Sequence, residues 1–455
     1  MSRILDLLKS NWLTMTCVAA IAVSLASFYW PTHAQGQAFV REVKGRTKDL
    51  GRIGNLMQTP TQIPPNNEND PPRPIQLAIN QPAIDKLESV FTRLADQYAG
   101  IYQEATELNR AGHTVMLEGL FPKPVNAARP FAARRAYAQV LTALYQSLNA
   151  SLPPSQEDVD KLLAETSRKF RRRYNLPDEL SGAERAQLTR EQASALIKFY
   201  KQAARRLHLY SQPVVLDLST GEWKPGPFQV GEWAKDPSPR IDDIWEGQMQ
   251  LWIQQDIVHA LRLANNMDDP NASVVAAPVK RLVEIIVKPG YIGLDNRRSG
   301  ARASAPPDPK GLIKSLRDLT SKRLPDNFAV SPTGRTSNPI YDVRHAVLKV
   351  VADSQQIPRL INAINQVNFM TVIGISLRNV DEYADFRKGF FYGDKVDVFE
   401  VVLEIETLWM RSWLAGDLEE KDAADANRRY DEGLIPDGVR QDLGLPTRGS
   451  IVATP

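Results

Sequence analysis

One uncharged, apolar stretch near the N-terminus constrains this chain more than any other feature. It runs from Trp12 to Trp30 and reads WLTMTCVAAIAVSLASFYW. A helix of about 20 such residues, rising about 1.5 Å per residue, crosses the hydrocarbon core of a membrane. Trp12, Tyr29 and Trp30 lie at its ends, where aromatic rings favour the headgroup level. No comparable apolar run follows, so the sequence predicts a single-pass anchor after a cytoplasmic lead of residues 1–11.

A cleavable signal peptide is the alternative for the same stretch. Arg3 and Lys9 would form its basic n-region, and Pro31–Ala34 ends in a small residue, as a cleavage site does. The apolar part of a signal peptide usually has about 7–15 residues, whereas this stretch is longer and is framed by Trp. We therefore predict retention as an anchor, and cleavage after Ala34 stays open as the alternative.

The charges beside the span bear on its orientation. The segment from Arg41 to Lys48 is more basic than the lead that contains Arg3 and Lys9, which taken alone favours a cytoplasmic body. Long domains, however, cross the membrane largely regardless of their charge. We predict an inner (cytoplasmic) membrane protein with its N-terminus inside and its soluble body in the periplasm.

Composition sets the limits of what the body can do. A chain of 455 residues predicts more than one domain, because single cores rarely grow past about 250–300 residues. The formal net charge of +3 gives no overall field for nucleic acid, so we expect no nucleic-acid partner. The single cysteine, Cys17, lies in the apolar stretch, which excludes disulfides and a thiolate nucleophile in the body.

Proline density predicts a linker over residues 31–82, and a heptad pattern follows it over residues 83–111. Apolar residues there alternate in spacings of three and four until Gly112, which predicts one continuous helix. The pattern consists of Ile84, Leu87, Phe91, Leu94, Tyr98, Ile101, Ala105 and Leu108. Such a stripe packs either on its own domain or in a coiled coil with another chain, and the sequence leaves both open.

Residues 112–210 form a helical region in this interpretation. Ser155 is the expected N-cap of one helix, and Thr189 with Gln192 forms the expected capping box of the next. Arg168–Tyr174 (RKFRRRY) is the strongest basic segment of the chain. It could bind an acidic partner or an anionic envelope polymer, although acidic neighbours such as Glu165 favour a solvated helix face.

The remaining chain reads as mixed α and β. We expect a first α/β unit at 211–295, a linker at 296–338, a ferredoxin-like domain at 339–413 that folds alone, and a flexible tail at 414–455. The evidence for the third of these is a strand–helix–strand–strand pattern with antiparallel pairing. It consists of Val343–Ala352, Gln356–Val367, Phe369–Leu377 and Val396–Trp409. The predicted fold class is α+β, with an N-terminal transmembrane helix and a helical body before the sheet.

No catalytic, cofactor-binding or metal-binding residue is expected. The five histidines include no pair at metal-binding helical spacing, and we interpret His259 and His345 as packing or surface residues. Nucleophile-elbow, P-loop and dinucleotide-binding patterns are absent from the sequence. Trp223 and Trp233 follow Gly-Glu in a repeat, which predicts a hairpin or paired loop; packing explains them better than stacking on a sugar.

The layout and several short motifs resemble a known family. The motifs are Ile244–Trp252 (IWEGQMQLW), Ser331–Arg335 (SPTGR), Tyr341–Arg344, Asn368–Val372 and Glu406–Trp409. Together with one membrane helix and one heptad helix, they resemble the PilO and GspM inner-membrane components of type IV pilus and type II secretion systems. Within that class, the chain is most similar to the long PilO-like envelope proteins of Planctomycetes and Verrucomicrobia.

This resemblance implies a scaffold that performs no chemistry and holds no cofactor. Such a protein would align its partners in a pilus-like or secretion apparatus, as a homo- or hetero-oligomer. Its contacts would be the membrane through Trp12–Trp30, the heptad helix and a free sheet edge. The alternative is a membrane-tethered or secreted binding module for envelope polymer that uses Trp223, Trp233 and the Arg168–Arg173 cluster.

Overall fold

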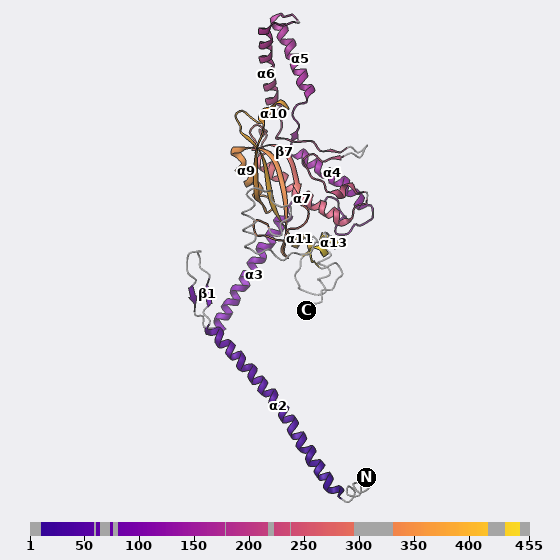
Figure 1. The fold of residues 1–455 in the computed structure, drawn as a ribbon, viewed down its shortest axis with the longest axis vertical. Coiled ribbons are helices and arrows are strands. Elements are labelled where there is room, and N and C mark those ends of the chain that lie inside the picture. Colours follow the sequence, from indigo (N-terminus) through magenta and orange to yellow (C-terminus); the bar gives the residue numbers. More distant parts are fainter. Residues whose placement is uncertain are drawn as a thin grey trace. The chain divides into compact units, whose positions relative to one another are not determined.

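The computed structural model describes residues 11–58, 61–63, 73–75, 81–177, 179–216, 223–236, 238–294, 331–416 and 433–445. The chain divides into two compact units, Met1–Ile101 and Tyr102–Pro455, which are described one after the other. The fold class is α+β, as the sequence predicts (Figure 1).

The first unit is dominated by one long helix, α2 (Trp12–Gln58). The short strands β1 (Thr61–Ile63) and β2 (Arg73–Ile75) pair antiparallel after it. The expected linker over 31–82 is therefore wrong in its first part, because α2 continues through it to Gln58. Between Pro31 and Pro60 the sequence contains no proline, and pairs such as Glu42–Arg46, 2.8 Å apart, support the helix.

Helix α3 (Gln81–Arg110) begins in the first unit and ends in the second. Its bounds match the heptad pattern, and Gly112 follows it with a φ of +80°. This left-handed conformation is favourable for glycine and ends the helix.

Four further helices lie in the second unit before and beside its sheet. They are α4 (Arg129–Ser147), α5 (Gln156–Tyr174), α6 (Gly182–Ala204) and α7 (Ile241–Ala264). Ser155 caps α5 as predicted, because its side chain accepts a hydrogen bond from the Asp158 amide. The predicted start of α6 at Thr189 is wrong: the capping box is formed by Ser181 and Glu184, so the helix begins at Gly182.

The main sheet of the second unit has the strand order β3-β4-β7-β8-β10-β9. Its strands are β3 (Ala150–Ser151), β4 (Leu209–Tyr210), β7 (Val279–Val287), β8 (Tyr341–Asp353), β9 (Met370–Asn379) and β10 (Val398–Met410). The pairs β3–β4 and β4–β7 are parallel, and the other neighbours are antiparallel. A separate pair consists of β5 (Val215–Leu216) and β6 (Trp223–Lys224).

The C-terminal part of the sheet follows the predicted strand–helix–strand–strand pattern. Helix α9 (Ile357–Asn365) connects β8 to β9, and β10 lies between these two strands. Helix α7 contacts both α9 and β7 (Figure 1). Because β7 also pairs with β8, the segments 211–295 and 339–413 build one sheet and not two successive units. Backbone pairing of β7 with β8 thus joins two segments that a polar, proline-containing stretch separates in the sequence.

Short helices complete the second unit. They are α10 (Glu382–Arg387), α11 (Arg411–Ala415), α13 (Asp437–Asp442) and the 3-10 turns η1 (Glu232–Lys235) and η4 (Ser354–Gln356). The expected flexible tail at 414–455 is wrong for residues 433–445. Ile435, Val439 and Leu443 are buried and belong to the main core, because these apolar side chains pack against the body. Most of the expected linker at 296–338 lies outside the described residues.

Candidate functional site

The apolar N-terminal part of α2 is the one membrane-length segment among the described helices. The window Trp12–Tyr29 is long and apolar enough to cross a bilayer, and none of it is buried within the protein. A side chain such as Phe28, 75% exposed, is costly to leave in water. This supports a single-pass membrane anchor.

A second exposed apolar surface follows the heptad pattern of α3. We call it the heptad stripe, and its large members are all exposed. They are Ile84 (45%), Leu87 (54%), Phe91 (60%), Leu94 (52%), Tyr98 (57%), Ile101 (69%) and Leu108 (58%). The stripe is therefore not buried against the described residues of its own chain.

Three residues of α7 contact residues 113–116, the segment that follows α3. Gln248, Trp252 and Asp256 recur every four residues, so they lie on one face of α7. The Gln248 Oε1 accepts a hydrogen bond of 2.8 Å from the Met116 amide, and the Trp252 Nε1 donates one of 2.9 Å to the Thr114 carbonyl. Asp256 contacts the histidine that precedes Thr114 in the sequence. This face of α7 thus holds the segment that follows α3 in place.

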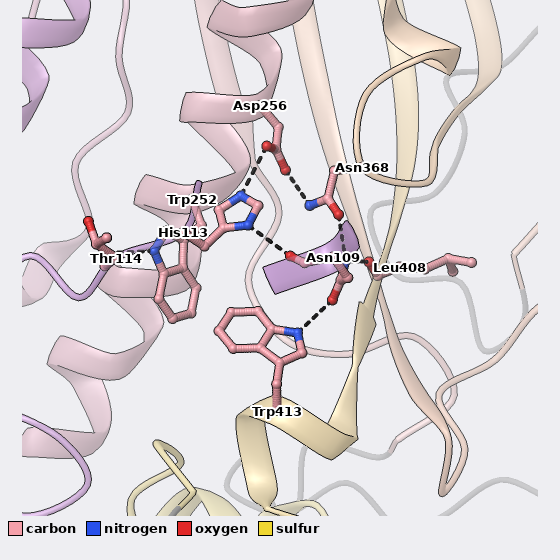
Figure 2. A network of polar contacts seen from close by, with 8 residues as sticks. All are labelled: Asn109, His113, Thr114, Trp252, Asp256, Asn368, Leu408 and Trp413. Atoms are coloured by element: carbon pink, nitrogen blue, oxygen red, sulfur yellow. Dashed lines mark hydrogen bonds and ion pairs between the residues drawn. The ribbon is translucent and has the colours of Figure 1, made fainter. Parts of the chain in front are cut away.

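His113 is held through both of its ring nitrogens (Figure 2). Its Nδ1 lies 2.9 Å from the carbonyl oxygen of Asn109, so this nitrogen carries a proton. Its Nε2 lies 3.0 Å from Asp256 Oδ1, and both side chains are more than nine-tenths buried. A buried carboxylate requires such a partner, because an unpaired charge in the core is costly.

Asn109, on the last turn of α3, is fully buried and connects four parts of the fold. Its Nδ2 donates to Asn368 Oδ1 at 2.6 Å and to the Leu408 carbonyl at 2.9 Å. Its Oδ1 accepts from Trp413 Nε1 (Figure 2) and from the Met410 amide, both at 2.8 Å. One side chain therefore uses its full hydrogen-bonding capacity to attach α3 to β10 and α11.

The circuit closes through Asn368, whose Nδ2 donates to Asp256 Oδ2 at 2.6 Å. We call Asn109, His113, Asp256, Asn368 and Trp413 the Asn109 cluster. Aromatic rings enclose it: the His113 ring stacks on Trp413 and meets Trp252 and Trp409 at their edges, with centroids 5.0–6.2 Å apart. In such low-dielectric surroundings, satisfied hydrogen bonds stabilise one arrangement and exclude others.

A second buried polar cluster contains Ser331, His345 and Glu406, residue types found in hydrolase triads. The Ser331 Oγ lies 3.2 Å from His345 Nε2, and Glu406 Oε2 lies 4.0 Å from the same nitrogen. A triad requires the acid and the nucleophile on opposite ring nitrogens. Glu406 instead accepts from Thr333 at 2.7 Å and from Arg335 at 2.8 Å, so the cluster holds residues 331–335 on β10.

Burial affects the protonation of His345 in this cluster. Burial lowers the pKa of His345 to about 4, against an ordinary value of 6.5, although the nearby Glu406 carboxylate acts in the opposite direction. His345 therefore packs as a neutral ring, as we expected of it, whereas His259 is exposed. In the described residues no group of three or more His, Cys, Asp or Glu side chains is placed to hold a metal ion.

Several of the residues that would serve polymer binding are packed or paired. Trp233 is 6% exposed and stacks edge-on against Tyr137, with ring centroids 5.3 Å apart. Packing therefore explains Trp233, as expected. Of the predicted hairpin or paired loop, Trp223 lies half-buried in β6, which pairs antiparallel with β5, whereas Trp233 lies in the turn η1. In the basic segment, Lys169 pairs with Glu165 at 2.6 Å. Three arginines of the segment form the last turn of α5, where cations favour the helix dipole.

Comparisons with known proteins give little. No model of a protein family matches this chain, and no curated protein matches its sequence. Among solved structures, the chain is similar to a crystal structure from Akkermansia muciniphila, with 11% sequence identity and a TM-score of 0.22. The match covers 62% of this chain and 94% of that one. A similarity at this level carries no argument about function.

Sequence reasoning did not find the Asn109 cluster. The periodic apolar patterns of α3 and α7 include neither Asn109 nor Asp256. A signal was nevertheless present: Gln248, Gln254 and Asp256 are polar residues inside an otherwise apolar helix, and each is more than nine-tenths buried. Buried polar side chains require partners, and those partners are distant in the sequence.

Proposed function

We propose that this protein is a non-catalytic, single-pass envelope scaffold that assembles through its heptad stripe. The observation that carries the proposal is the exposure of seven large apolar side chains along one line of α3. Contiguous apolar surface of this kind marks an interaction site, because it is costly to leave in water. A partner helix with the same heptad spacing would bury it.

The residues that flank the heptad stripe favour a coiled coil. Among the positions that flank its a and d residues, Glu88 and Glu104 are the charged ones, and Val90, Ala95 and Tyr102 widen the apolar surface. The two acidic residues leave few like charges to oppose pairing. The Asn109 cluster supports a scaffold role because it attaches the end of α3 to the sheet domain.

The proposed location is the inner membrane, with α2 as the anchor and the sheet domain in the periplasm. The proposed setting is a pilus-like or secretion apparatus, and the layout that resembles PilO and GspM supports it. The supporting features are one membrane-length helix, one heptad helix and a strand–helix–strand–strand sheet, in that order.

The test is a charge in the middle of the heptad stripe of the full-length protein. Leu94→Asp should lower the mass measured by sedimentation in detergent, or release a partner that co-purifies from native membranes. The thermal melt should stay unchanged, because Leu94 is 52% exposed. Ser89→Asp is the matched control: it places the same charge on the opposite face of α3 and should leave the mass unchanged. An unchanged mass and unchanged partners in the Leu94→Asp protein would refute the proposal.

A further inference from the structure

Strand β9 forms one edge of the six-stranded sheet, and beyond a bulge at Ile373 its outer half, residues 374–379, is regular. It pairs with β10, and no other described strand pairs with it. Edge strands usually avoid association by being short or by carrying proline, lysine or several charges. β9 has ten residues, MTVIGISLRN, with no proline and with Arg378 as its one charged residue.

The outer half of β9 also presents apolar side chains beside the core. Ile375 pairs with Leu403 and Leu377 pairs with Val401 across the β9–β10 ladder. Directly opposite residues point to the same face of a sheet. Leu403 and Val401 are fully buried on that face, whereas Ile375 and Leu377 are each 49% exposed. The apolar layer of the core therefore continues to the edge, where the described residues cover only about half of the Ile375 and Leu377 side chains.

We propose that β9 pairs antiparallel with β9 of a second copy of this chain, about a two-fold axis at Ser376. In this register Ile375 lies opposite Leu377 of the second copy, and the reverse, so the exposed apolar residues cover each other. Arg378 lies opposite Gly374, which has no side chain to crowd it. The pairing extends the ladder by one strand and satisfies backbone groups that face solvent at the edge.

Charge also favours a second copy as the occupant. Arg378 is compensated within its own sheet, because its guanidinium lies 3.9 Å from Glu400. On the two-fold axis, the facing residues are two uncharged serines. The symmetric register therefore places no like charges opposite each other. A charged edge strand that paired with its own copy could place like charges opposite each other, which is destabilising. This inference deepens the proposed scaffold function by naming one partner, and it rests on that function only for its biological purpose.

Cysteine cross-linking in the full-length protein tests the register. In a Cys17→Ser background, Ser376→Cys should form a disulfide-linked dimer on mild oxidation, since directly opposite residues lie within disulfide reach. Asn379→Cys is the matched control, exposed on the same strand. In the proposed register its two copies lie about 20 Å apart and should not cross-link. Equal cross-linking of the Ser376→Cys and Asn379→Cys variants, or cross-linking of neither variant, would overturn the proposal.

A double substitution separates this contact from the heptad stripe. Ile375→Lys with Leu377→Lys should abolish the cross-link of the Ser376→Cys chain and leave the thermal melt unchanged, because both side chains are exposed. Undiminished cross-linking would overturn the proposal. Leu94→Asp in the same background should leave the cross-link intact. A failure of the scaffold proposal, seen in the Leu94→Asp protein, is then distinguishable from a failure of β9 pairing.

Discussion

Asn109 and Trp413 are joined by a hydrogen bond of 2.8 Å, although 304 positions separate them in the sequence. The bond attaches the last turn of α3 to α11, directly after β10. Asn109 also binds the Met410 amide and the Asn368 side chain. The end of the heptad helix is thus fixed by side-chain contacts to the C-terminal part of the sheet.

Asn109→Ala should destabilise the protein by about 2–4 kcal/mol. The substitution leaves the Trp413 indole and the Met410 amide without their partner in a buried site, and each such loss costs about 1–3 kcal/mol. Urea denaturation followed by circular dichroism measures the effect. The control is Asn379→Ala, at an exposed position, which should stay within about 0.5 kcal/mol of the native protein. Similar stabilities for the two variants would contradict the role of the Asn109 cluster.

His345 should make stability depend on pH in the acid range. Its pKa is about 4 in the folded state and 6.5 in its ordinary state, so below pH 6.5 the unfolded chain binds the proton first. The free energy of unfolding should fall by about 3 kcal/mol between pH 6.5 and 4 on account of this residue. His345→Asn should remove that part of the pH dependence. Parallel stability curves for the two proteins across this range would show the assignment to be wrong.

Gly247→Ala should destabilise the second unit by about 1–3 kcal/mol. A Cβ at this position of α7 would lie 2.3 Å from the Trp233 Nε1, in a packed core that cannot move freely. Gly100→Ala on α3 is the matched control, because nothing lies within 4 Å of its Cβ. It should stabilise the helix by about 0.5–1 kcal/mol. Thermal melts of the two variants should therefore shift in opposite directions.

Residues 339–413 should not fold alone, contrary to the expectation from sequence. β7 pairs with β8 over most of its length, and α7 packs on α9, so the fragment loses a central neighbour and a core layer. A fragment of residues 238–416 keeps both and should fold. Amide exchange distinguishes them: the shorter fragment should exchange uniformly fast, and the longer one should show protection in β8 and β10. Protection in the shorter fragment would restore the original expectation.

The apolar segment Trp12–Trp30 should remain in the mature protein. It is long enough to span a membrane, and the helix that contains it continues to Gln58. N-terminal mass spectrometry of protein purified from membranes measures the outcome directly. A mature start at Gln35 would mean that the segment is a signal peptide and that the body is released.

Local patterns in the sequence predicted the elements that depend on neighbouring residues. The membrane-length stretch, the heptad helix, the Ser155 cap and the strands of the C-terminal part all follow from periodicity and capping chemistry within one element. Two predicted helix boundaries were wrong because other residues in the same region favour a longer helix. Ser181 with Glu184 capped α6 in place of Thr189, and a proline-free segment let α2 continue.

Tertiary structure alone decided which segments meet. The sequence separated 211–295 from 339–413 by a polar, proline-containing stretch, yet backbone pairing of β7 with β8 makes them one sheet. Likewise, no local pattern identifies the partners of Asn109 and Asp256, because those partners lie over a hundred positions away in the sequence. Periodicity predicts which face of a helix or strand is apolar, but it does not predict which segment packs against that face. The partner is fixed only when buried hydrogen bonds and core packing are satisfied together in the folded chain.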